Sequence, residues 1–158
     1  MRLFPASPDQ AQPVLDGFCF EGTYTTILRL EAHGLSRALF RNQPGRLSLA
    51  FAEAGLCRGR AAGRPFRAIP NRFTCLLMPD EVLDLQVSSP RLVGFVIQIS
   101  VEMLIQECAL HRIDNPAPET LLDTIPGHES LLLACARQLL ELRDQPESVA
   151  KARMVLPL

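Results

Sequence analysis

Apolar residues alternate with polar or small residues along the first part of the chain, in short stretches divided by turn signals. Leu47, Leu49 and Phe51, for example, alternate with serine and alanine, which places the three larger side chains on one face of a strand. His33-Gly34 and Asn42 to Gly45 are turn signals between such stretches. The pattern predicts strands at residues 23–30, 36–41, 47–52, 56–60, 65–69, 73–78, 82–87 and 91–99. Short strands at this spacing indicate a sandwich or barrel rather than βαβ units.

The last predicted strand differs from the others because it is apolar on both faces. Residues 91–99 read RLVGFVIQI, and Gln98 is the polar exception inside this run. A strand that alternates has one face in water, whereas a strand without alternation is covered on both sides. We therefore expect this strand to lie inside the molecule with another layer on each face.

After Ile99 the period changes from that of strands to that of helices. Ser100 is a good N-cap, and Glu102 stands in the first turn, where a negative charge stabilises a helix. The pattern predicts helices at residues 101–111 and 128–143, a short helical turn at 119–125, and a last helix that ends near residue 155. We expect a single domain over residues 1–158, with a β-barrel at about 14–99 and a helical dimerisation part at about 100–156.

The composition indicates a globular chain with a sizeable core. It has 158 residues, of which 47% are hydrophobic, and a formal net charge of −1. This charge gives no overall attraction to nucleic acid or to an anionic membrane. No apolar run is long enough to span a bilayer, and residues 1–13 lack the apolar segment of a signal peptide. Together with an odd number of unpaired cysteines, this predicts a reducing cytoplasmic location without membrane contact.

Residue types that carry chemistry are scattered. His33, His111 and His128 are far apart in the sequence, and neither His-x-His nor Cys-x-x-Cys occurs. Metal sites in small barrels use clustered histidines with a carboxylate, so we predict no metal and no cofactor. No nucleophile elbow, phosphate loop or dinucleotide fingerprint occurs either. We therefore predict no catalytic residue and no enzymatic activity.

Arginines cluster in the middle of the chain. Arg58, Arg60, Arg64, Arg67 and Arg72 occur with no acidic residue between Glu53 and Asp80. One interpretation is a site for an anion or a phosphate. The other is a solvated strand edge, where charges prevent sheets from pairing with one another. We favour the second interpretation for most of these arginines, while one of them could face an acidic ligand or partner.

The helix predicted at 128–143 carries two adjacent apolar rows. One row is His128, Leu132, Cys135, Leu139 and Leu142, and the other is Leu133, Ala136 and Leu140. One row is enough to dock a helix on its own sheet, so the second row predicts contact with a partner helix in a homodimer. We assign Leu132, Cys135, Leu139 and Leu142 to the dimer interface. The rows could be exchanged, and a fully buried helix is the alternative.

The order of these features resembles a known family. Leu76-Leu77-Met78-Pro79 forms a corner, and the apolar strand at 91–99 is followed directly by the helix start SVEML. This order is similar to the N-terminal effector-binding domain of AraC-type bacterial transcription regulators. The resemblance implies an α+β fold, in which a cupin-like jelly-roll barrel is followed by amphipathic helices for dimerisation. It also implies a DNA-binding helix-turn-helix domain, which would lie beyond residue 158 and provide the only contact with DNA.

The resemblance implies that the barrel senses a small-molecule effector without a metal. From strand alternation we expect one strand face and several phenylalanines to line the site, while Arg37 and Arg41 face solvent. The expected ligand-binding residues are Tyr24, Thr26, Leu28, Phe40, Leu49, Phe51, Phe66 and Phe95. The alternatives are a stand-alone cupin-like enzyme and an interaction module with a filled barrel.

Overall fold

Two antiparallel β-sheets with two helices make up the described part of the protein. The computed structural model describes residues 2–5, 14–22, 24–112 and 127–141. The strands are β1 (Arg2–Pro5), β2 (Val14–Glu21), β3 (Thr25–His33), β4 (Leu35–Arg41), β5 (Arg46–Ala54), β6 (Cys57–Ala61), β7 (Arg64–Arg67), β8 (Arg72–Leu77), β9 (Val82–Val87) and β10 (Arg91–Ser100). The helices are α1 (Val101–Leu110) and α3 (Glu129–Glu141).

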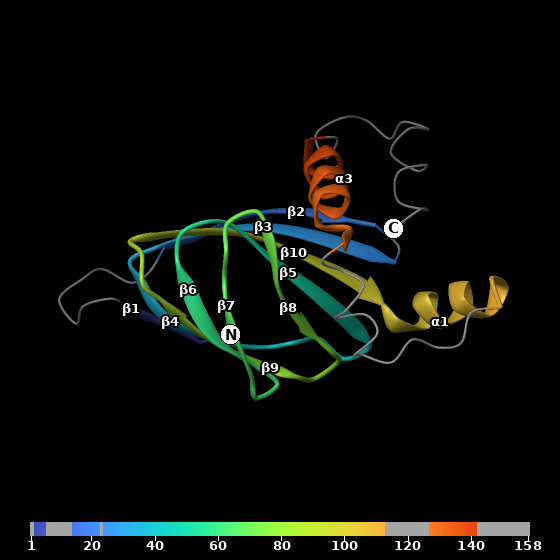
Figure 1. Cartoon of the computed structure of the whole chain (residues 1–158), viewed down its shortest axis with the longest axis horizontal. Helices are drawn as coiled ribbons and strands as arrows, with labels where there is room; N and C mark the ends of the chain where they lie inside the picture. The colour runs from blue at the N-terminus through green and yellow to red at the C-terminus, as the bar shows by residue number, and fades with distance from the viewer. Residues whose placement is uncertain (1, 6–13, 23, 113–126, 142–158) are drawn as a thin grey trace.

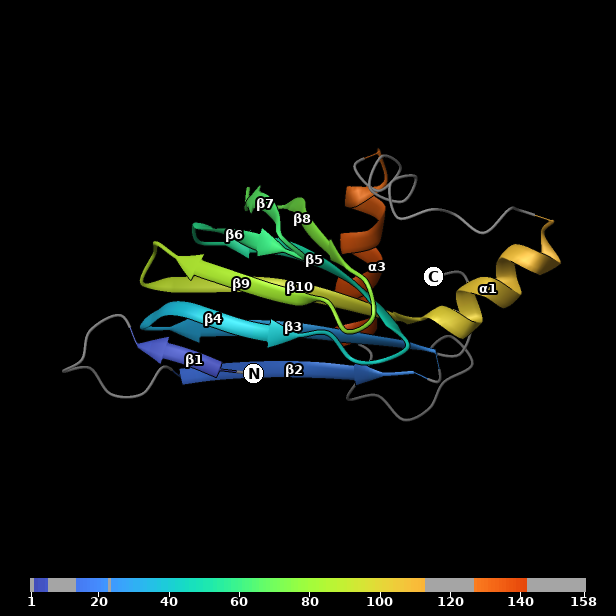
Figure 2. The same ribbon diagram turned by 90° about the horizontal axis from the view of Figure 1, so that it is seen from below.

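Each sheet contains five strands. One has the order β1-β4-β9-β6-β7 and is called the β9 sheet here, and the other has the order β2-β3-β10-β5-β8 and is called the β10 sheet. The described strand pairs are antiparallel. Seen from below, the β9 sheet lies in front of the β10 sheet (Figure 2). Successive strands such as β4 and β5 belong to different sheets, as in a jelly roll.

The predicted strands are confirmed, with shifts of one or a few residues at their ends. β9 has the expected bounds, and β10 lies between β3 and β5 at the centre of its sheet. The sequence pattern named no strand before residue 23, although β1 and β2 are present. Gly17 interrupts the pattern of β2, and this strand forms by pairing along β3 rather than from a strong period of its own.

The proline corner after β8 is held by its own side chains. Asp80 has a φ of 63°, in the left-handed region that asparagine and aspartate tolerate best after glycine. The Met78 N–H donates to Glu81 Oε2 at 2.8 Å, and Arg64 Nη2 donates to the same oxygen at 3.3 Å. The carboxylate of Glu81 therefore closes the turn that links the two sheets, from β8 to β9.

A close approach fixes the turn between β5 and β6. Gly55 has a φ of 93°, and a Cβ atom at this position would lie 2.8 Å from Ser89 Oγ and 3.0 Å from Leu92 Cα. Neither the backbone angle nor the space suits another residue, so glycine is required here. The turn thus brings β5 and β6, which belong to different sheets, against the start of β10.

The two helices begin where the sequence predicted. Ser100 Oγ accepts a bond from the Met103 N–H at 3.4 Å, which confirms the expected N-cap of α1. α1 extends away from the barrel, whereas α3 lies across the outer face of the β10 sheet (Figure 1). The helices predicted at 119–125 and towards residue 155 lie outside the described residues. No helix in the described ranges is long and apolar enough to cross a membrane.

Candidate functional site

Strand register assigns the side chains of the β10 sheet to two faces. Cross-strand partners share a face, and Val96 of β10 is paired with Leu28 of β3 and with Ala50 of β5. Ala50 packs with Phe40 and Leu83 of the β9 sheet, so this face points into the barrel. The inner wall is therefore made of apolar and mostly small residues, among them alanines at positions 32, 50 and 52.

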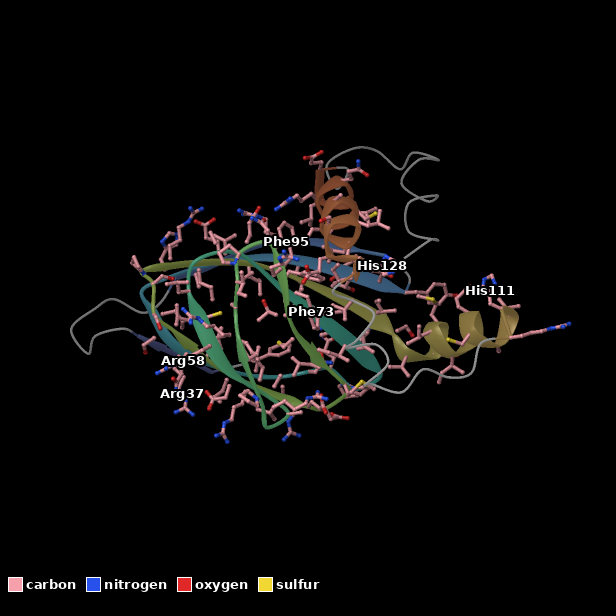
Figure 3. All side chains as sticks on the ribbon, viewed as in Figure 1. Arg37, Arg58, Phe73, Phe95, His111 and His128 are labelled. Carbon is pink, nitrogen blue, oxygen red and sulfur yellow. The ribbon has the colours of Figure 1, made fainter. Side chains whose placement is uncertain are left out.

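The other face of the β10 sheet points outward and is covered by α3. Phe95 is paired with Phe51, and both are 2% exposed. They belong to the largest core cluster, together with Leu133, Ala136 and Leu139 of α3. Figure 3 shows Phe95 at the base of α3. β10 is thus covered on both sides, as its unbroken apolar run predicted.

The predicted ligand wall is split between these two faces. Thr26, Leu28, Phe40 and Phe66 are on inward-facing positions, as expected. Three predicted wall residues lie on the outer face beneath α3 instead, and these are Leu49, Phe51 and Phe95. The expectation that these three residues share one wall with the others is therefore wrong. Strand alternation gives two faces but not their direction, and the bulky face of β5 and β10 packs against the helix.

Tyr24 is not part of the inner wall, although it was expected to bind the ligand. It precedes β3, and the residue is 46% exposed. Its carbonyl oxygen accepts bonds from the Ser100 N–H at 2.8 Å and from Arg46 Nη1 at 3.0 Å. The residue therefore connects the start of β3 to the junction between β10 and α1.

On the central strands of the β10 sheet, side chains of the outer face are more deeply buried than side chains that point into the barrel. The outward-facing Ile27 and Ile97 are completely buried. The inward-facing Leu28, Leu30 and Val96 are on the same central strands, yet each retains partial solvent exposure. The helix seals the outer face, so the more accessible apolar surface is the one inside the barrel.

A buried polar cluster lies at one end of this inner wall. Ser48 Oγ donates to Asn42 Oδ1 at 2.6 Å, and Gln98 Nε2 donates to Ser48 Oγ at 3.2 Å. Asn42 Nδ2 bonds the carbonyl oxygens of residues 46, 77 and 78. Strand alternation did not predict this cluster, and its one signal in the sequence is Gln98, the polar exception in an apolar strand. Chemically, the cluster adds hydrogen-bonding groups to a wall that is otherwise apolar.

Two cysteines also occupy inward positions, one in each sheet. Burial raises the pKa of the Cys57 thiol to about 11 and that of Cys75 to about 12. Both thiols are therefore protonated at neutral pH, and the thiolate is the nucleophilic form of cysteine. These two residues act as small apolar side chains of the barrel wall.

The histidines are distributed over different parts of the molecule. His33 contacts Glu31 at 2.9 Å, and His111 contacts Glu107 at 3.6 Å at the end of α1. His111 and His128 lie at separate places in Figure 3. Within the described ranges, no group of three or more His, Cys, Asp and Glu side chains could hold a metal ion. That the barrel works without a metal stays a prediction.

The predicted dimer row of α3 is also divided by the structure. Leu139 is 1% exposed and packs against the barrel together with Leu133 and Leu140, so its assignment to an outer contact row is corrected. Leu132 and Cys135 are partly buried beside that row. Leu142 lies outside the described residues. A helix of 3.6 residues per turn buries positions three and four apart together, which joins Leu139 to the inner row.

Comparison with solved structures supports the fold. The chain is similar to the AraC-like transcriptional activator CuxR, with a TM-score of 0.60 and 10% identity, over 95% of this chain and 56% of that one. It thus spans little more than half the length of that activator. This likeness shows that the chain shares its fold with part of an AraC-like regulator, as the resemblance in the sequence led us to expect.

Two further similarities have lower scores. The Schizosaccharomyces pombe Cnp3 cupin domain has a TM-score of 0.48 and 10% identity, over 72% of this chain and 76% of that one. The Cupin_2 domain of an XRE family transcriptional regulator from Enterobacter cloacae has a TM-score of 0.42 and 18% identity, over 56% of this chain and 95% of that one. No family model and no curated protein sequence matches the chain.

Proposed function

We propose that this chain is the effector-sensing and dimerisation domain of a transcription regulator, and that its barrel binds a small molecule without a metal and without catalysis. The observation that carries the proposal is the burial pattern of the β10 sheet. Leu28 and Val96, which face the interior, retain partial exposure, whereas Ile27 and Ile97, which lie on the same strands and face α3, are fully buried. Accessible apolar surface inside a closed fold is the usual feature of a small-molecule site.

The chemistry of the inner wall defines the class of effector. Leu28, Leu30, Val96 and Ala50 favour a compact apolar body. The cluster of Asn42, Ser48 and Gln98 at one end favours a single hydrogen-bonding group on the ligand. Glu21 is paired with Thr26 at the exposed end of this wall, whereas Leu28, Ala50 and Val96 at its centre are uncharged, so we propose a neutral, mainly apolar molecule.

The other candidate functions differ from this proposal in what the interior does. A cupin-like enzyme would convert its substrate, and the protonated thiols of Cys57 and Cys75 are poor nucleophiles for such chemistry. An interaction module would have a filled interior and no ligand. The partial exposure of the inner wall favours binding over a filled barrel.

Titration with Nile red, a neutral dye that fluoresces in apolar surroundings, tests the proposal. We expect saturable binding of about one dye per chain to folded protein. Ala50→Phe places a ring in the interior beside Val96 and Phe40 and should weaken dye binding at least tenfold. Ala109→Phe on the exposed surface of α1, which extends away from the barrel, is the matched control and should leave binding unchanged.

Both variants are compared at temperatures where circular dichroism shows a folded protein. Val96→Leu, a smaller change on the same wall, provides a second measurement if Ala50→Phe fails to fold. Absence of saturable dye binding by the wild type, or equal binding by all variants, would contradict a ligand site in the barrel.

A further inference from the structure

The outer face of the β9 sheet carries a group of arginines from three strands, which we call the arginine face. Arg58 of β6 is paired with Arg67 of β7 and with Gln86 of β9, and Arg60 is paired with Asp84 of β9. Cross-strand partners share a face, so these side chains project on the same side. Arg37 and Arg41 of β4 continue this face beyond β9. The arginine face comprises Arg37, Arg41, Arg58, Arg60 and Arg67.

Positive charge exceeds negative charge on this face. Arg37 forms a bidentate ion pair with Asp84, in which Nε donates to Oδ1 and Nη2 donates to Oδ2, each at 2.8 Å. This ion pair lowers the pKa of Asp84 below its usual range. Asp84 is the acidic member of the face among the described residues. Within the same ranges, Arg41, Arg58 and Arg67 form no ion pair. Figure 3 shows Arg37 and Arg58 close together on the side away from α3.

Protection of a strand edge does not account for this arrangement. β7 is an edge strand, but β4 lies between β1 and β9, and β6 lies between β9 and β7. Both edges of β4 and of β6 are therefore hydrogen-bonded to neighbouring strands. No open edge remains there for arginines to protect from pairing with another sheet, which applies to Arg37, Arg41, Arg58 and Arg60. Arg64 and Arg72 from the same sequence run are explained differently, because they bind Glu81 and Glu129.

The arrangement has a cost that an anion would remove. Like charges directly opposite one another in a sheet, as for Arg58 and Arg67, are destabilising. The net charge of the chain is −1, so the arginines are a local feature and not part of an overall basic composition. Guanidinium groups bind phosphate or carboxylate oxygens through two parallel bonds, which makes an oxyanion the fitting partner.

The size and flatness of the face indicate a polymer with repeated phosphates. The steps from β4 to β7 span about 14 Å at the usual strand spacing, so one small anion would reach few of the arginines. From β4 to β7 the other residues of the face are Leu39, Pro65, Val82, Asp84 and Gln86, none of which is aromatic, and Phe4, which is paired with Arg37, lies in the edge strand β1. Single-stranded nucleic acids are bound through stacking on aromatic rings, so the face suits the outside of a duplex.

We propose that the arginine face binds the phosphodiester backbone of duplex DNA without reading its sequence. This differs from the expectation that only a separate helix-turn-helix domain touches DNA, and it does not depend on a ligand in the barrel. Backbone contacts position a protein on the duplex, while base contacts supply specificity. The face would therefore orient the sensing domain beside whichever site the regulator occupies.

Fluorescence anisotropy of a labelled 20-base-pair duplex with the 158-residue chain tests the proposal. Each phosphate contact lowers the slope of log affinity against log salt by about 0.9, so three contacts predict a loss of about 40-fold between 50 and 200 mM salt. The double variant Arg58→Gln with Arg67→Gln should reduce the size of this slope by about 1.8. Binding should be equal for duplexes of unrelated sequence.

A charge-matched variant separates the face from net charge. Arg91→Gln with Arg112→Gln removes the same charge elsewhere, because Arg91 pairs with Glu31 on the other sheet and Arg112 follows α1. This control should keep the wild-type slope. Thermal unfolding of the Arg58, Arg67 variant should occur at the wild-type temperature or above it, since repulsion has been removed.

Three results would overturn the proposal. One is equal loss of DNA binding in the two double variants, which would make the attraction a matter of overall charge. Another is equally tight binding of poly-L-glutamate, which would identify an acidic polypeptide as the partner. The third is tighter binding to vesicles of phosphatidylserine and phosphatidylcholine than to the duplex. Failure of dye binding in the barrel would leave this proposal standing, since the two surfaces are distinct.

Discussion

Cys57 and Cys75 are residues whose chemistry is set by where the chain folds. They lie in β6 and β8, and therefore in different sheets, and both point into the barrel. Burial destabilises the charged thiolate relative to the neutral thiol, because the thiolate loses more hydration energy. Both pKa values are therefore raised above the ordinary value of 9. Sequence alone predicted buried small residues here, and burial confirms that interpretation.

Alkylation measures this effect directly. At pH 8, and in protein dilute enough to be monomeric, we expect iodoacetamide to modify Cys57 and Cys75 at least tenfold more slowly than Cys135, which is partly exposed on α3. Peptide mass spectrometry after timed quenching gives the rates, and urea-unfolded protein serves as the control in which all three should react alike. Faster modification of Cys57 or Cys75 in the folded state would contradict the buried placement.

Among the described residues, the ionised carboxylate of Glu31 is the one for which we predict a loss of stabilisation in acid. Bonds from Arg91 and His33 lower the pKa of its carboxyl group from 4.5 to about 2. A lowered pKa in the folded state stabilises the protein fully above about pH 4.5, and the contribution is lost as the pH falls towards 2. Glu31→Gln should therefore lower the unfolding midpoint in urea at pH 6, with a difference that shrinks between pH 4.5 and 2.

Glu141→Gln at the exposed end of α3 is the control for this titration, since the same charge is removed without such a contact. Its midpoint should follow the wild type across the pH range. A Glu31→Gln difference that stays constant from pH 6 to pH 2 would show that the carboxylate contributes nothing as a charge.

At the scale of elements, α3 is attached to the β10 sheet by more than its apolar row. Glu129 at its start is 7% exposed, accepts the Phe73 N–H at 2.7 Å and pairs with Arg72 at 2.9 Å. About two turns further along the helix, Arg137 Nη2 donates to Glu53 Oε1 at 3.3 Å and to Asn71 Oδ1 at 3.1 Å. These contacts bind the helix to β5 and to the start of β8, so a movement of either strand would move α3.

Removing the first of these contacts should loosen the helix. Glu129→Ala leaves the Phe73 N–H without its partner, and the loss of such a partly buried bond costs about 1–3 kcal/mol. Arg72→Ala should cost less than about 1 kcal/mol, because its side chain is 64% exposed and the solvent screens its charge. Urea denaturation of both variants tests the difference, and equal costs would mean that the ion pair rather than the backbone bond matters.

At the scale of the whole molecule, α3 has one side for the barrel and one side without a described partner. Leu133, Ala136, Leu139 and Leu140 face the sheet. Leu131 is 63% exposed, and apolar positions continue around the helix at Ala134 and Cys135. We propose that this second side, with Leu132 at its margin, forms the homodimer contact expected from the two apolar rows.

Sedimentation of the isolated chain tests the dimer. We expect a dimer at tens of micromolar, and Leu131→Lys with Ala134→Lys should give a folded monomer, since charges on an exposed side need not enter the core. Leu139→Ala is the contrasting variant and should cost about 2–5 kcal/mol of stability, because its side chain is fully buried. A wild-type monomer at that concentration would show that α3 serves only the core.

Much of the architecture followed from the sequence because local periods are strong signals. The period-two stretches located β3 to β10, and the serine at position 100 marked the start of α1. The double-sided apolar run predicted that β10 is covered on both faces, and the helix and the second sheet provide those covers.

Only the tertiary structure decided the direction of each face. Alternation groups Leu49 with Phe51 but does not say whether that group meets a ligand, a helix or water, because inside and outside are defined by the second layer. α3 covers this group, so the predicted wall was divided and Thr26 and Leu28 remained inside. The same holds for charge. Arg37 and Arg58 are far apart in sequence, and the register of β4, β9 and β6 places them on one surface.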